Sequence, residues 1–236
     1  MIFISDIHLN IKNPITIKKF LKFLKYSLNN IKSLYILGDL FDVWIGDDYK
    51  NILYKKIAHE LFSLKNRGIS CYFIPGNHDF LIGKYYAKSC GMILLPEKKI
   101  INFLNKKIII LHGDSLCIND YSYKIFRYII RSKFLKNIFL RLPLYLRLKI
   151  FKKIQNKSNL KKKYKFNIKI NEKKILKIFN ETNFDIMIHG HIHQKNIFIL
   201  KNKNKIFYRA VLGSWENNGS AIYITKSKIK LINFLF

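Results

Sequence analysis

Five short runs of apolar residues along the chain each stop at a polar residue whose side chain can bind a metal ion. The runs are rich in β-branched residues, which is typical of β-strands. Open α/β sheets bind their ligands at the carboxyl ends of the strands, so these five ends predict one shared site. The five junctions are IFIS before Asp6-Ile7-His8, LYIL before Gly38-Asp39, CYFI before Gly76-Asn77-His78-Asp79, KIIIL before His112-Gly113-Asp114, and DIMI before His189-Gly190-His191.

Helical patterns lie between the first three of these strands. Asn13 and Pro14 suit a helix N-terminus, as the capping residue and the first helical residue. An apolar stripe at helical spacing follows them, and a second stripe over residues 53–64 ends before Gly68. From Ile206 to Phe236 short strands alternate with turns, which predicts an antiparallel meander. The chain is therefore expected to be α/β with mixed sheets.

The stretch from Leu116 to Phe166 has a different pattern, in which apolar residues at helical spacing are interleaved with lysine and arginine. A helix is expected to restart at Pro143. One interpretation is an ordinary helical hairpin with its basic residues in water. We favour a lid with an apolar groove or a membrane-facing side, because the stretch has more apolar residues than a small hairpin can bury. The expected division is a core of residues 1–115 and 167–236, with a helical insert of residues 116–166.

The residue types at the five junctions favour a centre of two metal ions. Two divalent ions can hold both the attacking and the leaving oxygen of a phosphoryl group, and a carboxylate can bridge them. Asp39 is the expected bridge. Mixed oxygen and nitrogen ligands without thiolate suit Mn, Fe, Co or Zn better than Ca or Mg. The expected ligands are Asp6, His8, His191 and Asp39 for one ion, and Asn77, His112, His189 and Asp39 for the other.

The composition adds little to this interpretation. A net charge of +30 over 236 residues suits an anionic partner, but lysine, asparagine and isoleucine are abundant throughout, and we attribute most of the excess to a coding sequence biased toward A and T. The three scattered cysteines are typical of a reducing compartment. The first strand starts at Ile2, and no apolar run reaches about 18 residues, so we expect no signal peptide, no transmembrane helix and a cytoplasmic protein.

The ordered motifs D-x-H, G-D-x-x-D, G-N-H-D, H-G-D and H-G-H-x-H resemble those of the calcineurin-like metallophosphoesterase family. The similarity extends over essentially the whole chain and includes the insert. It is closest to one branch, the enzymes that hydrolyse a UDP-linked diacylated sugar in lipid A synthesis. The tryptophan-glycine-aspartate segment of this branch is far more specific than the metal motifs, which many phosphoesterases share. The stretches that carry the resemblance are residues 34–42, 44–48, 76–83, 112–117, 209–215 and 233–236.

The resemblance implies a calcineurin-like four-layer α/β/β/α sandwich of two mixed sheets flanked by helices, with a helical lid insert. It implies that water attacks the α-phosphorus of UDP-2,3-bis(3-hydroxyacyl)glucosamine, giving UMP and 2,3-bis(acyl)glucosamine 1-phosphate (lipid X). Two Mn²⁺ ions per chain are the implied cofactors, with other divalent transition metals as alternatives. The implied partners are the UDP-linked diacylated glucosamine lipid and the anionic inner-membrane surface, to whose cytoplasmic face the protein would attach peripherally. No nucleic acid is expected, and we expect a monomer.

The same resemblance suggests which residues act on the substrate. His78 stands where this branch usually has arginine after the rim asparagine, and where the wider family has histidine. It is expected to donate a hydrogen bond to the transition state, so that His78 and the bridging Asp39 are the expected catalytic residues. The apolar insert would receive the two acyl chains. The expected substrate contacts are Asn77, His78, Asp120, Ser158, Lys162, Lys165 and His189.

Two other functions remain open from the sequence. One is a dimetal phosphodiesterase acting on nucleic acid or a dinucleoside polyphosphate, which an open basic groove leading to the metals would favour and an apolar cleft beneath the insert would disfavour. The other is a basic membrane or nucleic-acid scaffold that kept the fold without catalysis. Loss of a bridging ligand would support the scaffold, but all the expected ligands are present.

Overall fold

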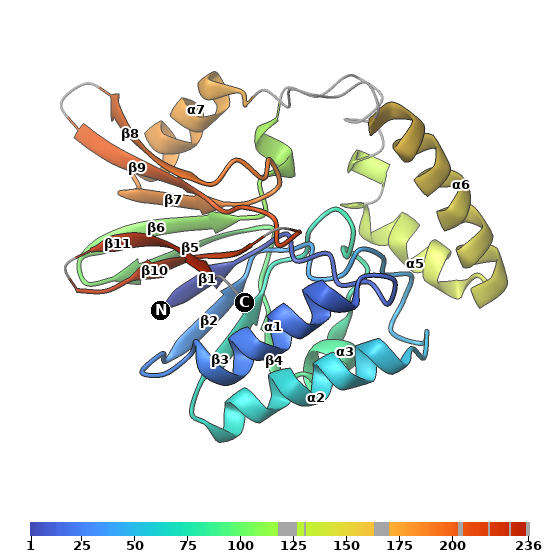
Figure 1. The fold of residues 1–236 in the computed structure, drawn as a ribbon. Coiled ribbons are helices and arrows are strands. Elements are labelled where there is room, and N and C mark those ends of the chain that lie inside the picture. The colour runs from blue at the N-terminus through green and yellow to red at the C-terminus, as the bar shows by residue number, and fades with distance from the viewer. Residues whose placement is uncertain are drawn as a thin grey trace.

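The computed structural model describes residues 1–117, 127–129, 131–162, 170–202, 205–216, 218–226 and 228–234, with residues 155–162 described as backbone only. Two mixed β-sheets lie face to face, and helices cover their outer faces (Figure 1). The predicted fold class, a sandwich of two mixed sheets flanked by helices, is confirmed. None of the helices in the described ranges is long and apolar enough to cross a membrane.

The first sheet joins parallel strands from the N-terminal half to an antiparallel pair from the C-terminus. The first four strands along the chain are parallel to one another, and the last two pair antiparallel at the edge. In spatial order the strands are β11 (Ile229–Phe234), β10 (Gly219–Ile224), β1 (Ile2–Ile4), β2 (Ser33–Ile36), β3 (Ser70–Phe73) and β4 (Met92–Leu94).

The second sheet has parallel inner strands and antiparallel edge strands. Its order is β5 (Lys98–Phe103), β6 (Lys106–Leu111), β7 (Ile186–His189), β9 (Lys205–Val211) and β8 (Asn196–Asn202). The expected meander over residues 206–236 is therefore wrong, since β9 lies in the second sheet and β10 and β11 lie in the first. Strand patterns identify strands, but pairing is a long-range choice that the local pattern does not contain.

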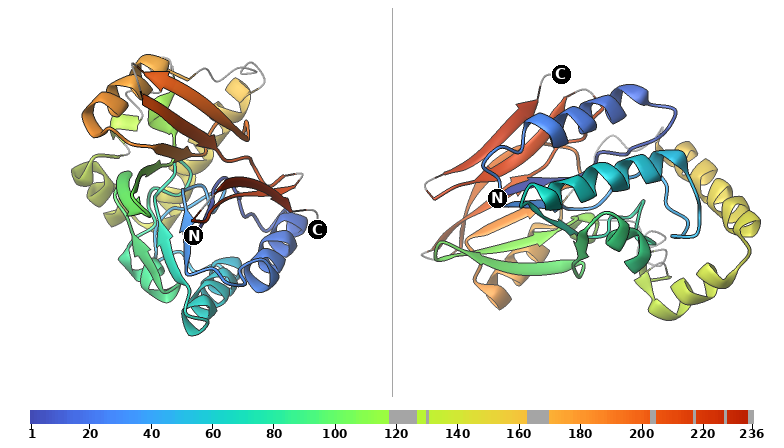
Figure 2. Two further views of the ribbon diagram at one scale, coloured as in Figure 1. Left: turned by 90° about the vertical axis from the view of Figure 1, so that its left-hand side faces the viewer. Right: turned by 90° about the horizontal axis from the view of Figure 1, so that it is seen from below.

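The helices form the outer layers of the sandwich (Figures 1 and 2). The first of them starts as predicted, because the Asn13 side chain accepts a hydrogen bond from Thr16 N at 3.2 Å and Pro14 is the first helical residue. Helices α1 (Pro14–Tyr26), α2 (Ile52–Asn66) and α3 (Lys84–Ser89) cover the first sheet, and α7 (Glu172–Thr182) covers the second. A 3₁₀ turn, η1 (Asp114–Leu116), follows β6.

The remaining helices, α5 (Lys133–Arg141) and α6 (Leu144–Lys162), stand at one end of the sandwich (Figure 1). Both lie within the expected insert, and α6 starts directly after Pro143, as the sequence predicts. The described side chains of these helices lie mostly at the surface. Few of the described side chains of α5 and α6 therefore pack in the apolar core.

Apolar side chains fill both interfaces of the first sheet. Phe3, Ile110 and Ile188 belong to a cluster that lies between the two sheets, and all three are fully buried. Phe20 and Ile57 belong to a second cluster, which packs the helices against the first sheet. Because the central strands are covered on both faces, nearly all their positions are apolar.

Candidate metal centre

The loops that follow the parallel strands meet where the two sheets adjoin. The loop after β2 contacts the loop after β6, because the ring nitrogen Nδ1 of His112 lies 2.8 Å from Leu37 O. The loop after β1 pairs with the loop after β2 through Asp6 N to Gly38 O at 3.1 Å. We call this junction the rim, formed by residues 5–8, 38–42, 76–79, 112–114 and 189–193.

Several rim residues have left-handed backbone conformations, which residues other than glycine rarely adopt. The φ angles of Asp6, His8, Asp39, His191 and His193 lie between 52° and 71°. Such angles cost free energy and persist where the surrounding contacts impose them, often at functional sites. The five residues include both carboxylates and two of the histidines that the sequence predicts as ligands.

Asp39 lies at the middle of the rim and is 2% exposed. Its Oδ2 is 3.5 Å from His112 Nε2 and 3.7 Å from His8 Nε2. The other oxygen, Oδ1, accepts a hydrogen bond from His78 N at 2.9 Å. Asp39 belongs to two groups of side chains that could each hold a metal ion, one with His8 and His78 and one with His112 and His191. A carboxylate shared in this way suits a bridge between two ions.

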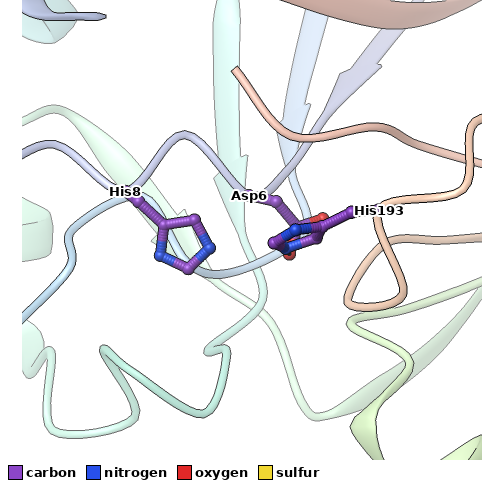
Figure 3. A group of neighbouring side chains, drawn as sticks. All are labelled: Asp6, His8 and His193. Carbon is purple, nitrogen blue, oxygen red and sulfur yellow. The ribbon is translucent and has the colours of Figure 1, made fainter. Parts of the chain in front are cut away.

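Asp6 is fully buried beneath the loop after β7. Its carboxylate accepts hydrogen bonds from Ser5 Oγ at 2.5 Å and from His191 N at 2.9 and 3.1 Å. Figure 3 shows the His193 ring beside it, with Nε2 3.4 Å from Asp6 Oδ1. Gly190 leaves no room for a side chain, since a Cβ atom there would collide with Ser5 Oγ and Asp6 Oδ2.

The arrangement differs from the sequence prediction in how the histidines are grouped. The third group that could hold an ion is formed by Asp6, His8 and His193, whereas His191 lies with Asp39 and His112. The sequence places His191 with Asp6 and does not include His193 among the expected ligands, although the H-G-H-x-H motif contains both. How the ligands divide between two ions therefore stays a prediction.

Of the remaining expected ligands, His112 and His189 come from the second sheet, whereas Asn77 follows β3 of the first. His112 is 2% exposed, and its Nε2 is 2.9 Å from Asn77 Oδ1. His189 is fully buried, with Nδ1 2.9 Å from Gly190 O. Its other nitrogen, Nε2, is buried without a hydrogen-bond partner among the described residues. A buried polar atom without a partner is costly, and a metal ion would satisfy this one. The donor set and this orphaned nitrogen fit a divalent transition metal.

Burial and neighbouring charges set different protonation states for the rim histidines. Burial lowers the pKa of His189 to about 4, and burial and the nearby His112 lower the pKa of His191 to about 4, so both are neutral at pH 7. Burial opposes the charge of His112, but Asp39 and Asp6 raise its pKa to about 9. The pKa of the Asp6 carboxyl is lowered, since contacts with His193 and His112 outweigh burial. A divalent ion bound beside Asp39 would take the place of the proton that these carboxylates hold on His112.

Asp42 is a rim residue that the sequence analysis left without a role, although it closes the G-D-x-x-D motif. Its backbone oxygen lies 2.9 Å from His78 Nδ1, and its Oδ1 is 3.7 Å from the same nitrogen. Asn10 Nδ2 donates a hydrogen bond to Asp42 Oδ2 at 2.9 Å. Asp42 therefore orients the His78 ring.

Asp79 joins two rim loops through their backbones. Its carboxylate accepts hydrogen bonds from Gly76 N at 2.8 Å, Leu40 N at 2.7 Å and Asp39 N at 3.2 Å. Burial and the Asp39 charge raise the pKa of Asp79 to about 6. Asp114, in the loop after β6, pairs with Arg127 Nε at 2.8 Å.

Replacing Asp79 by asparagine should lower the free energy of unfolding by about 3 kcal/mol, because the amide presents its own N–H groups to buried backbone donors. Urea unfolding of the metal-free protein measures this loss. The exposed Glu181→Gln is the matched control, with an expected change within about 0.5 kcal/mol. Equal stability of the two variants would show that the Asp79 contacts do not hold the rim loops.

Four expected substrate contacts cannot be placed. Asp120 and Lys165 lie outside the described residues, and only the backbone is described at Ser158 and Lys162. These contacts stay predictions.

The sandwich and the rim define a metal-dependent phosphoesterase. A model of the calcineurin-like phosphoesterases matches residues 1–195. Two relatives named UDP-2,3-diacylglucosamine hydrolase match over nearly their whole length. The one from Proteus mirabilis is 44% identical over 100% of this chain and 99% of its own length. The one from Wigglesworthia glossinidia brevipalpis is 48% identical over 99% of this chain and 93% of its own length. The chain belongs to the calcineurin-like phosphoesterase family, in the branch of the UDP-2,3-diacylglucosamine hydrolases.

A solved structure of an archaeal phosphodiesterase has the same fold. It is 12% identical, with a TM-score of 0.50 over 99% of this chain and 100% of that one. This similarity supports the two-sheet architecture.

Proposed function

We propose that the protein hydrolyses the pyrophosphate bond of UDP-2,3-bis(3-hydroxyacyl)glucosamine in lipid A biosynthesis. Water would attack the α-phosphorus, and UMP and 2,3-bis(acyl)glucosamine 1-phosphate would be released. The observation that carries the proposal is the full-length identity of 44% and 48% to two hydrolases named for this substrate. The rim of buried carboxylates and imidazoles supports it, because a pair of metal ions held by such side chains can activate water and stabilise a phosphoryl group.

Two Mn²⁺ ions are the proposed cofactors. Asp6, His8 and Asp39 would hold one ion together with an imidazole of the loop after β7. Asn77, His112, His189 and Asp39 would hold the other. When bound, such ions lower the pKa of a coordinated water and neutralise charge on the phosphoryl oxygens.

His78 is the proposed hydrogen-bond donor to the reacting phosphate. Its ring nitrogen Nδ1 lies 2.9 Å from the backbone oxygen of Asp42, so Nδ1 donates a hydrogen bond to that oxygen. In the protonated ring, Nε2–H is then available to a phosphoryl oxygen, with the Asp42 carboxylate nearby to balance the charge. The leaving lipid phosphate needs no general acid, because its second pKa is about 6.

The insert of residues 116–166 is the proposed site for the two acyl chains and for contact with the membrane surface. Helices α5 and α6 expose large apolar side chains together with basic ones, a composition that suits lipid chains and anionic headgroups. The protein would thus attach peripherally to the cytoplasmic face of the inner membrane. The exposed apolar residues are Phe134, Leu135, Ile138, Tyr145, Ile150 and Ile154, and the exposed lysines include Lys133, Lys149, Lys152 and Lys153.

Product analysis tests the proposed reaction directly. Purified protein incubated with the UDP-linked diacyl sugar and Mn²⁺ should release UMP and the sugar 1-phosphate in equal amounts. A parallel incubation with a dinucleoside polyphosphate and with single-stranded RNA tests the alternative function, that of a phosphodiesterase acting on these substrates. Turnover of either alternative without release of UMP from the lipid would overturn the proposal.

A further inference from the structure

The segment of residues 44–48, W-I-G-D-D, follows the Asp39 loop but contributes no side chain to the rim. Trp44 is 1% exposed, and its ring packs against Tyr54 and Tyr86 with ring centroids 4.3 Å apart in each case. Its indole N–H donates to Asp47 Oδ1 at 3.2 Å. The Asp47 carboxylate also accepts from Gly83 N at 2.9 Å and Tyr86 N at 3.0 Å, at the start of α3. One end of the segment is thus fixed to the core.

The same segment also binds the insert through Arg147 of α6. Arg147 Nη1 donates to Ile45 O at 2.7 Å and to Asp48 Oδ1 at 2.8 Å, and Nη2 donates to Asp48 Oδ2. Nε donates to Leu142 O at 3.0 Å within the insert. The planar guanidinium fork matches a carboxylate with two parallel hydrogen bonds, which a lysine cannot do. The hydrogen bond from Arg147 lowers the pKa of the Asp48 carboxyl.

Arg147 is the only fully buried residue among the described side chains of α5 and α6, at 2% exposure. No side chain of α5 is buried, although Phe139 and Leu140 pack partly against the core. With so few buried apolar side chains among those described, α5 and α6 gain little from the hydrophobic effect, so the contacts of Arg147 weigh heavily in where α6 lies.

Gly46 makes the contact possible. Its φ of +138° lies in a region that favours glycine, and a Cβ atom there would collide with Arg147 Nη1. The same atom would lie 2.6 Å from Asp48 Oδ1 and 3.2 Å from Leu140 Cδ2. Gly46, Asp48 and Arg147 therefore fit one another as a unit, which we call the insert anchor.

Further cationic contacts join the insert to the rim and to its flanking residues. Arg131 Nη2 donates to Pro75 O at 3.2 Å and Gly76 O at 3.1 Å, and Lys136 Nζ donates to Phe80 O at 2.8 Å. These oxygens flank Asn77 and His78. The insert therefore lies beside the rim loop, and the anchor fixes the far helix, α6, relative to it.

We infer that Arg147 and Asp48 are positioning residues that hold the insert in place for a lipid-bearing substrate, so that the W-I-G-D-D segment selects lipid substrates without touching the reacting atoms. The inference rests on the proposed function, since it assigns the acyl chains to the insert. Loss of the anchor should weaken binding of the diacylated substrate and leave hydrolysis of a small phosphodiester at the rim unchanged.

The test compares Arg147→Met, Arg147→Lys and Asp48→Asn with the control Arg141→Met, which removes an exposed arginine from the same insert. Two properties are measured with Mn²⁺ present. The first is hydrogen–deuterium exchange of residues 133–154. The second is kcat/KM for the UDP-linked diacyl sugar and for bis(p-nitrophenyl) phosphate, a small substrate without acyl chains.

In R147M, exchange in residues 133–154 should rise about tenfold, while exchange in the strands of the first sheet stays as in the wild type. The kcat/KM for the lipid should fall about tenfold, mainly through KM, and that for the small diester should stay within about twofold. R147K should recover part of the loss, D48N should show a smaller loss, and R141M should match the wild type.

Unchanged exchange in both R147M and D48N would overturn the inference, and so would raised exchange with unchanged KM for the lipid. Failure of the proposed function gives a different result. In that case the wild type hydrolyses the small diester but not the lipid. The insert then has no role in lipid binding, whatever the hydrogen–deuterium exchange shows. If R147M fails to fold, the measurements on D48N decide.

Discussion

Replacing Asp39 by alanine should abolish hydrolysis, with kcat lower by on the order of a thousandfold or more, because loss of metal-supplied charge stabilisation costs several kcal/mol. Asp39 is shared by two groups of side chains that could each hold an ion, so its removal affects both. It also removes the acceptor that holds His78 N at 2.9 Å. Release of UMP and the Mn²⁺ retained after dialysis are the measurements.

Asp39→Asn is the matched variant, because its amide oxygen can still accept the His78 N–H while the negative charge is lost. It should keep the fold and still release little UMP. Turnover of D39A with Mn²⁺ near the rate of the wild type would show that the rim is not the reacting centre.

Replacing Gly190 by alanine should be nearly as damaging. The new methyl group would collide with Ser5 Oγ and Asp6 Oδ2, which are fully buried, so the Asp6 carboxylate or the loop after β7 must move. Overpacking of this kind typically costs about 1–3 kcal/mol, and here it displaces an expected metal ligand. We expect Mn²⁺ content and UMP release to fall together, with a lower urea midpoint.

The double variant S5A/G190A separates the collision from a general effect of the substitution. It should recover part of the Mn²⁺ content, because one of the two obstructing oxygens is gone while Asp6 Oδ2 remains. Wild-type metal content in G190A would contradict the tight packing around Asp6.

The rim could be predicted from the sequence because each of its elements is local. A buried strand followed by Asp6 and His8, or by His189 and His191, is visible within about ten residues, and parallel strands end at a common edge. The predicted sandwich followed from the same patterns together with the family resemblance. The grouping of His191 and His193 was not visible, since both lie two residues apart in one loop and their ring positions depend on its left-handed backbone angles.

The long-range contacts were the part that local patterns could not reveal. Residues 206–211 and 219–234 look alike as strands, but they belong to different sheets. The sequence does not single out Arg147 either, because it is one of 44 lysines and arginines and no recognisable motif surrounds it. Its burial depends on Asp48, which lies 99 residues earlier.

The rim draws Asp6, His8, Asp39 and Asn77 from the first sheet and His112, His189 and His191 from the second. During synthesis on the ribosome, the early carboxylates therefore emerge long before the last imidazoles, and no nascent fragment shorter than about 190 residues carries the full ligand set. Metal loading should thus follow translation, and the ions would tie together the two halves of the chain once both have folded.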